Sequence, residues 1–246
     1  MNYCEFIKNK RVVLVGPSPI LHNRGMGEYI DDFDIVVKTN GFIANSEEKI
    51  RRDYGSRIDV ICFNMQYSRL LVSSHSCEIK KLIKNNNILP RFICVKALKN
   101  KTRNFFKNSI FKESNTRKIQ TFERPSYFDS APFLGTLIIN DILMCNPASL
   151  NIIGFDFYCN TSNYNTIFGY QTMHILNNDV SHDDLNDTYD LDLSRVKKIL
   201  DMPRTRMHKE SNDLIYMMDL YNSNKIIVDD TLKKIFNHCQ KINCNL

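Results

Sequence analysis

The amino-acid sequence predicts an α/β protein with a mostly parallel central sheet flanked by helices. Short runs rich in Val, Ile and Leu, such as Arg11–Val15 and Leu150–Gly154, are bounded by turn residues, as is typical of parallel strands covered on both faces. The stretches between these runs carry helical periodicity or helix-ending signals. With 246 residues, 43% of them apolar, and no interdomain linker, the chain is expected to form one domain over residues 1–246.

Three strands are predicted in the N-terminal part of the chain: Arg11–Val15, Asp34–Lys38 and Ile58–Asn64. A Gly-Pro-Ser-Pro turn and a short polar helix up to Tyr29 separate the first two strands. A charged helix over Ser46–Gly55, which ends at a glycine cap, separates the second from the third. The alternation of strand and helix favours a doubly wound arrangement.

The rest of the chain continues the alternation of strands and helices. Further strands are predicted at Arg91–Val95, Leu150–Gly154 and Lys225–Val228. Helices are predicted at Tyr67–Asn85, Gly135–Cys145, from Leu191 up to Pro203, His208–Tyr221 and Thr231–Cys239. Residues 159–185 are polar, rich in Asn and Asp and without a regular pattern. A loop of that length inside a compact domain is more often an active-site lid than filler, so we expect a lid there.

The composition limits the cellular compartments in which the protein is expected. No stretch approaches the roughly 20 apolar residues of a membrane span, and Met1–Arg11 has no apolar core of a signal peptide. We therefore expect a cytoplasmic protein that at most rests on a membrane surface. The eight cysteines form no C-x-x-C pair and several lie in apolar runs, so all eight are expected to be reduced and structural.

The net charge of +6 is unevenly distributed. Between Lys96 and Lys118 there are eight Lys or Arg residues and one acidic residue, Glu113. Such a run can attract an anionic ligand, an acidic glycan, a membrane surface or nucleic acid, and the ordinary alternative is a solvated helical face. Because few aromatic residues interleave with the basic ones, nucleic acid is not the expected partner.

Polar residues follow several predicted strands. The turn Gly16-Pro17-Ser18 comes after the first strand, where open α/β sheets bind ligands, and suggests a phosphate or nucleotide. Pro17 and Pro19 remove two N–H donors, which makes this turn a poor phosphate cradle. Asn40 and Asn64 end the second and third strands and could bind a base or ribose, although asparagine is also common in turns.

Two tyrosines and a histidine are the candidates for chemistry. Tyr158 and Tyr164 could present hydroxyl donors to a phosphate, or each could be a half-buried ring under a loop. His182 lies in the segment SHDDLND, whose carboxylates could orient an imidazole that acts as a general base. The alternative is a surface histidine in an acidic turn. A metal site could be built from the same residues, but the His-Asp pair of metal phosphohydrolases needs helical partners and a further upstream histidine. Because this sequence alternates strands and helices, a metal is not expected.

Several segments of the sequence, taken in order, resemble motifs of the eukaryote-type sialyltransferases. The segments VVLVGPS, IDDFDIVVKTN and YGSR, in this order, resemble their large sialylmotif, and Ala131–Phe155 resembles the small one. His182–Asp187 is similar to their H-x4-E motif, with Asp in place of Glu. Tyr158 and Tyr164, six residues apart, are similar to the phosphate-binding tyrosine pair of bacterial lipooligosaccharide sialyltransferases.

This resemblance implies a Rossmann-like domain, the sialyltransferase variant of the GT-A fold. It also implies inverting, metal-independent transfer of sialic acid from the donor CMP-sialic acid to a glycan acceptor, with no further cofactor. His182 would take the acceptor proton, and Tyr158 and Tyr164 would donate to the departing phosphate. The implied nucleotide-binding residues are Gly16, Pro17, Ser18, Asn40, Asn64, Gly135, Thr136, Gly154 and Phe157.

The sequence also departs from the family pattern. Pro17 replaces an asparagine, Phe133 and Leu134 replace the Ser and Thr before Gly135, and Val12 replaces the cysteine of the large motif. Thr136 is the residue that would substitute for the missing hydroxyls. These departures keep open a second hypothesis, a nucleotide- or glycan-binding protein of the same fold without transfer activity. A nucleic-acid-binding protein is a third hypothesis.

Overall fold

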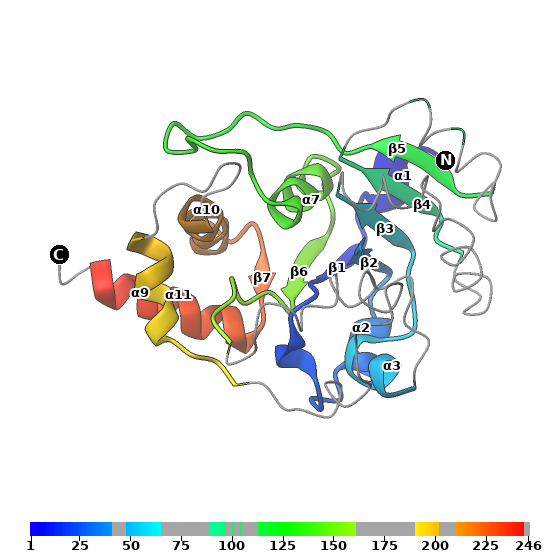
Figure 1. Ribbon diagram of the computed structural model, residues 1–246. Coiled ribbons are helices and arrows are strands. Elements are labelled where there is room, and N and C mark those ends of the chain that lie inside the picture. The colour runs from blue at the N-terminus through cyan, green and yellow to red at the C-terminus, as the bar shows by residue number, and fades with distance from the viewer. Residues whose placement is uncertain are drawn as a thin grey trace.

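The computed structural model describes residues 1–40, 48–64, 89–96, 100, 104, 113–160, 190–201 and 210–243. Within these residues the chain forms a seven-stranded sheet in the order β5-β4-β3-β2-β1-β6-β7, and each pair of neighbouring strands is parallel. The strands are β1 Arg11–Val15, β2 Ile35–Thr39, β3 Val60–Phe63, β4 Phe92–Val95, β5 Asn115–Lys118, β6 Ser149–Ile153 and β7 Ile227–Val228. The predicted α/β class with a parallel, helix-flanked sheet is confirmed (Figure 1).

Helices cover both faces of the sheet. The described helices are α1 Tyr3–Ile7, the 3-10 helix η1 Pro19–Leu21, α2 Gly27–Asp31, α3 Glu48–Tyr54, α7 Leu134–Leu143, α9 Ser194–Asp201, α10 Glu210–Asn222 and α11 Asp230–Asn243. Figure 1 shows α7 and α10 on one side of the sheet and α2 and α3 on the other. The predicted helix Tyr67–Asn85 lies outside the described residues.

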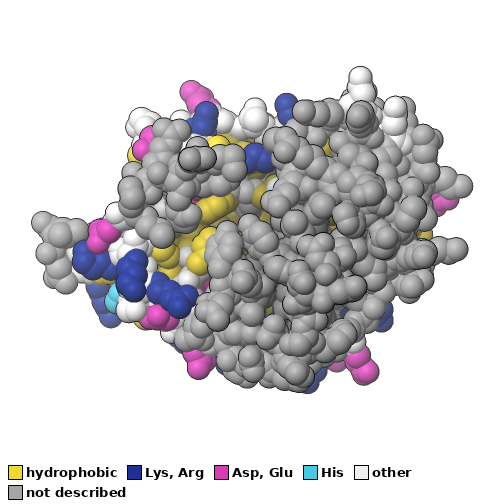
Figure 2. All heavy atoms as spheres, in the orientation of Figure 1, with side chains coloured by type: hydrophobic (Ala, Val, Ile, Leu, Met, Phe, Trp, Pro, Cys, Tyr) yellow, Lys and Arg dark blue, Asp and Glu magenta, His cyan; other side chains and the backbone are white. Residues whose placement is uncertain are grey.

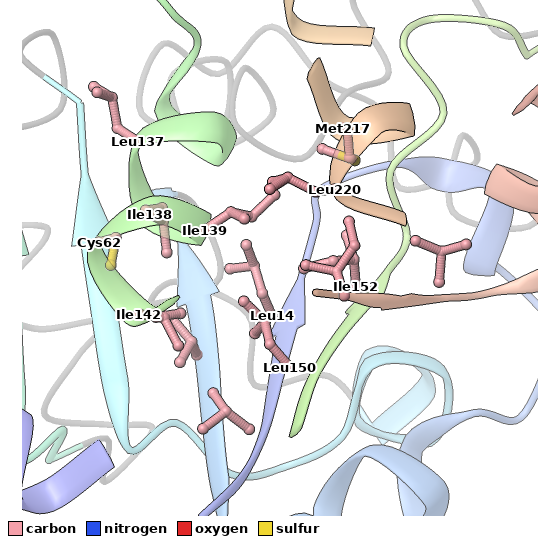
Figure 3. Close-up of a cluster of buried hydrophobic side chains, with 14 of the residues drawn as sticks. Leu14, Cys62, Leu137, Ile138, Ile139, Ile142, Leu150, Ile152, Met217 and Leu220 are labelled. Atoms are coloured by element: carbon pink, nitrogen blue, oxygen red, sulfur yellow. The ribbon is translucent and has the colours of Figure 1, made fainter. Parts of the chain in front are cut away.

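Strand β1 shows why these runs are apolar without alternation. Val12 and Leu14 belong to the core cluster that includes residues of α1, α7 and α10, whereas Val13 and Val15 belong to the cluster under η1, α2 and α3. Successive side chains of a strand point to opposite faces, so both faces of β1 are buried. Figure 3 shows the first cluster, in which side chains of α7 and α10 meet those of the strands.

The strand order creates a switch point in the middle of the sheet. The chain runs from β1 outward to β5, then returns to form β6 on the other side of β1. In open α/β sheets, ligands bind outside the carboxyl ends of the strands where the order reverses. This edge of the sheet, beyond β1 and β6, is called the carboxyl edge below.

Two features of the fold differ from the sequence-based expectations. Cys4 in α1 and Cys145, just after α7, form a disulfide with their Cα atoms 4.6 Å apart, so the expectation that all eight cysteines are reduced is wrong for this pair. Residues Asn115–Lys118 of the basic run form the strand β5 and not a helical face. No described helix has the length and apolar character needed to cross a membrane.

Lys38 is a buried lysine on the α2 and α3 side of the sheet. Only 2% of it is exposed, and its Nζ donates to the carbonyl oxygen of Gly55 at 2.7 Å. Gly55 follows α3 with φ +76°, so Lys38 caps the negative end of that helix. Burial lowers the pKa of Lys38 from 10.5 to about 7, while Asp31 and Asp59 act in the opposite direction.

This lowered pKa makes stability depend on pH. Between about pH 7 and 10.5 the unfolded chain holds a proton on Lys38 that the folded protein has released, so the free energy of unfolding should rise with pH. The slope from this group is up to about 1.4 kcal/mol per pH unit. Urea denaturation between pH 7 and 9 should therefore show a smaller slope for Lys38→Met than for the parent. Lys197→Met, which changes an exposed lysine of α9, should keep the parental slope; equal slopes for all three proteins would contradict the assignment.

Candidate functional site

Two glycines bring together the loops that follow β1 and β6. The amide of Gly16 donates to the carbonyl of Ile153 at 2.8 Å, and the amide of Ser18 donates to that of Gly154 at 3.1 Å. A Cβ atom on Gly16 would lie 2.3 Å from the carbonyl oxygen of Gly154, and Gly154 has φ +71°. Both positions therefore require glycine for the close approach of the two loops at the switch point.

The ring of Phe155 occupies the space between two of the predicted nucleotide-binding glycines. A Cβ atom on Gly16 would lie 2.6 Å from this ring, and one on Gly135 at the start of α7 would also lie 2.6 Å from it. The absence of a side chain at Gly16 and Gly135 is thus explained by packing around Phe155.

Ser18 points into the protein. It is 4% exposed, and its hydroxyl donates to Asp156 at 2.5 Å and accepts from the amide of Ile20 at 3.2 Å. Its carbonyl oxygen accepts from the hydroxyl of Tyr54 at 2.6 Å. These hydrogen bonds hold the turn from Gly16 to Ser18 at the carboxyl edge. Pro17, the middle residue of the turn, is half-buried.

Asn40 and Asn64, at the ends of the neighbouring strands β2 and β3, are brought together. The side-chain oxygen of Asn40 accepts from the amide of Asn64 at 3.0 Å. Asn40 has φ 45°, in the left-handed region that asparagine tolerates better than most residues. Both residues are half-buried, so this pair is partly exposed at the carboxyl edge.

The turn after β6 carries backbone strain. Phe157 and Tyr158 have φ 49° and 62°, and each non-glycine residue in this region costs about 1–3 kcal/mol. The amide of Tyr158 donates to Asp156 at 3.1 Å, and its ring meets that of Phe133 edge-on at 6.3 Å between centroids. Strained residues held by their surroundings are concentrated at functional sites. The strain therefore favours a functional position for Tyr158.

Asp156 is a buried carboxylate that was not among the site residues predicted from the sequence. It is 6% exposed and accepts from Ser18, Tyr158 and the side chain of Asn160. Burial raises the pKa of Asp156, while these hydrogen bonds act to lower it. The Gly-Phe-Asp sequence at the end of β6 was the available signal, but its hydrogen-bond partner Ser18 is 138 residues away in the chain.

A second carboxylate, Asp213 of α10, occupies the N-terminal end of α7. It is fully buried and accepts from the amide of Phe133 at 2.9 Å and from the hydroxyl of Thr136 at 2.5 Å. A helix N-terminus attracts an anion, and here the anion is part of the chain. Thr136 is buried and its hydroxyl is directed to Asp213, which ties α7 to α10.

Lys96 is the described basic residue that reaches this region from the basic run. It follows β4, and its Nζ donates to the carbonyl of Pro132 at 3.2 Å, next to the start of α7. Burial lowers the pKa of Lys96, and the nearby Asp213 acts in the opposite direction. The guanidinium of Arg117 pairs with Asp141 and stacks over Tyr3, so this residue of the run faces the core and not a partner.

Tyr164 and His182, together with residues 161–185 of the predicted lid, lie outside the described residues, and so does most of the basic run. The described part of the surface shows a further group of basic side chains, over α9 and α11 (Figure 2). The exposed lysines of α9 and α11 are Lys197, Lys198, Lys233, Lys234 and Lys241. Lys197 and Lys233 pair with Asp201 and Asp230 within their own helices, as on an ordinary solvated face.

Comparisons with known proteins give structural neighbours only. No protein-family model matches this sequence, and the search of curated proteins finds no match. Solved structures similar to this chain include two of the sialyltransferase CstII from Campylobacter jejuni. The complex with the substrate analogue cytidine-5'-monophosphate has 16% sequence identity and a TM-score of 0.49, and the match covers 90% of this chain and 79% of that chain. The complex with CMP-3FNeuAc has 14% identity and a TM-score of 0.43, covering 91% of this chain and 86% of that one.

Proposed function

We propose that this chain is a sialyltransferase-like glycosyltransferase that transfers sialic acid from CMP-sialic acid to a glycan hydroxyl, with inversion and without a metal ion. The observation that carries this proposal is the convergence of the motif segments on one edge of the sheet. Gly16–Ser18 follows β1, Asn40 follows β2, Asn64 follows β3 and Gly154–Tyr158 follows β6. Segments far apart in sequence thus meet around the switch point between β1 and β6, where such sheets bind nucleotides.

Each assigned residue has a chemical task in the proposed reaction. The backbone at Gly16–Ser18 and the pair Asn40 and Asn64 bind the nucleoside. The acceptor oxygen attacks C2 of the sialic acid from the face opposite the phosphate and loses its proton to His182. The bond between C2 and the phosphate oxygen breaks, and the departing CMP phosphate receives hydrogen bonds from Tyr158 and Tyr164.

The phosphate is assigned to the tyrosines and not to the start of α7. Asp213 already accepts from the amide of Phe133 and the hydroxyl of Thr136, and its charge would repel a phosphate at that position. Gly135 and Thr136 then serve to keep α7 in position. The lid proposed for residues 159–185 would exclude water, whose attack on C2 would hydrolyse the donor.

The test is release of CMP from CMP-sialic acid in the presence of a panel of glycan acceptors, with the sialylated product identified by mass spectrometry. Tyr158→Phe removes one hydroxyl and should lower kcat by about 10²-fold while CMP still binds, because the lost donor acts mainly on charge developing in the transition state. Tyr29→Phe, a matched change of an exposed tyrosine in α2, should turn over like the parent. Equal turnover of all three proteins would exclude the phosphate-binding assignment of Tyr158.

A second candidate function keeps nucleotide binding and loses transfer. It is favoured by the departures from the family pattern at Pro17, Phe133 and Leu134, and by Asp213, which takes up the amide of Phe133 and the hydroxyl of Thr136 so that neither can act on the donor phosphate. Titration calorimetry with CMP, combined with the turnover assay, separates the two candidates. Tight binding with neither donor hydrolysis nor transfer would favour a nucleotide-binding protein.

A further inference from the structure

We propose that Asp156 is a positioning residue that couples three parts of the carboxyl edge: the turn Gly16–Ser18, the strained turn that presents Tyr158, and Asn160, which pairs with Leu191. The catalytic consequence of this inference rests on the proposed function, whereas the coupling itself does not. Asp156 touches none of the reacting groups and acts through Ser18, Tyr158 and Asn160.

The two oxygens of Asp156 divide these contacts between them. Its Oδ2 accepts from the hydroxyl of Ser18 at 2.5 Å and also from the side-chain amide of Asn160. Its Oδ1 accepts from the backbone amide of Tyr158 at 3.1 Å. One buried side chain therefore connects the loop after β1 with two points of the segment after β6.

A carboxylate is required because each of these three partners donates. An asparagine at position 156 would present its NH₂ group either to the side-chain amide of Asn160 or to the backbone amide of Tyr158, depending on the side on which its NH₂ group lies. With the NH₂ group toward Tyr158, two donors would face each other and a hydrogen bond would be lost. With the NH₂ group toward Asn160, the contact survives only if Asn160 turns its own amide over, so either orientation breaks or rearranges one of the present hydrogen bonds. The two acceptor oxygens of Asp156, and not only its shape, hold this arrangement.

The contact with Asn160 extends the coupling to residues on the other side of the segment 161–189. Asn160 forms an antiparallel bridge with Leu191, and the amide of Asp192 donates to the carbonyl of Cys159 at 2.9 Å. Arg195 of α9 also donates to the carbonyl of Tyr158 at 3.5 Å. The residues on either side of this segment are thus paired with each other and tied to Asp156.

The strain at Tyr158 gives the coupling its functional consequence. Phe157 and Tyr158 both have positive φ, a conformation that persists only where the surroundings impose it. The hydrogen bond from the Tyr158 amide to Asp156 is a described contact that imposes it. Without this contact the turn can relax, and the hydroxyl of Tyr158 then leaves the position in which it meets the departing phosphate.

The first experiment measures the coupling by hydrogen exchange of the full-length protein, without any substrate. Asp156→Asn should accelerate exchange at the amides of Tyr158 and Asp192 by at least about tenfold, because weaker contacts at position 156 loosen the turn at Tyr158 and, through Asn160, the pairing with residues 191–192. Asp230→Asn, which changes an exposed carboxylate of α11, serves as the control and should leave these two amides protected. Unchanged exchange in Asp156→Asn would overturn the proposal.

The second experiment measures kcat for transfer from CMP-sialic acid. Asp156→Asn should lower kcat by about 10–100-fold. In a protein that already carries Tyr158→Phe, the same change should lower kcat by less than about threefold, because the proposed effect is to misplace the Tyr158 hydroxyl, which is then already absent. The exchanged pair Asp156→Asn with Asn160→Asp reverses donor and acceptor between the two positions and should recover most of the activity. Equal losses in both backgrounds, or no recovery in the exchanged pair, would overturn the positioning role. Absence of turnover in the parent would contradict the proposed function, and the exchange experiment would then decide the coupling.

Discussion

Arg117→Ala is expected to lower the free energy of unfolding by about 3–5 kcal/mol, because it would leave the buried carboxylate of Asp141 without its cation. The side chain of Asp141 is 2% exposed and that of Arg117 is 17% exposed. Both Nη atoms of Arg117 donate to this carboxylate, with Nη2 to Oδ1 at 2.8 Å. The guanidinium also lies over the ring of Tyr3, 4.0 Å from its centre, so the change disturbs α1, β5 and α7 together.

The double variant Arg117→Met with Asp141→Leu is the control that separates loss of charge pairing from loss of packing. Replacing both charges by apolar side chains leaves no buried ion unpaired, although the amide of Gln120 loses Asp141 as its acceptor. Urea denaturation should therefore show the double variant to be more stable than Arg117→Ala. If the double variant were less stable than the single one, the large effect could not be attributed to the uncompensated carboxylate.

In the reaction proposed above, with His182 as the proposed general base, His182→Ala is expected to lower the rate of sialic acid transfer by about 10²–10⁴-fold, the range typical of a lost general base. The acceptor hydroxyl would then have to lose its proton to water, while the donor-binding groups stay in place. Binding of CMP, measured by titration calorimetry, should be unchanged. The fall in rate should therefore be in kcat and not in affinity for the nucleotide.

His238→Ala offers a matched histidine change in α11, a helix that contributes none of the residues assigned to the reaction. It should transfer sialic acid at the parental rate. If His182→Ala also turned over at that rate, another group would have to take the proton. If instead CMP binding were lost, His182 would have to be reassigned from chemistry to binding.

Most of the sheet could be predicted from the sequence, because the evidence for it is local. Five strands, β1, β2, β3, β4 and β6, are short apolar runs between turn residues. Four of them lie within about one residue of their predicted bounds, and the fifth, β3, is Val60–Phe63 where Ile58–Asn64 was predicted. Gly55 correctly predicted where α3 ends, whereas α7 ends at Leu143, two residues before its predicted end at Cys145. A parallel sheet then fixes that Gly16, Asn40 and Gly154 share one edge.

Other features carried no local signal. β5 has the burial pattern of a half-exposed edge strand, and its sequence Asn-Thr-Arg-Lys resembles the rest of the basic run. The disulfide between Cys4 and Cys145 joins residues 141 positions apart, and α1, which carries Cys4, is only five residues long. A helix that short is stabilised by its tertiary packing and not by its own propensity.

The sequence by itself therefore determined the secondary structure of the core, the parallel class of the sheet and the strand ends from which the motif segments extend. Only the tertiary structure decided which polar side chains meet there: Ser18 with Asp156 and Thr136 with Asp213, pairs separated by 138 and 77 residues. The reason is physical. Apolar periodicity is repeated along the chain and can be read locally, whereas a buried hydrogen bond is made once, between two groups that become neighbours only when the strands are ordered.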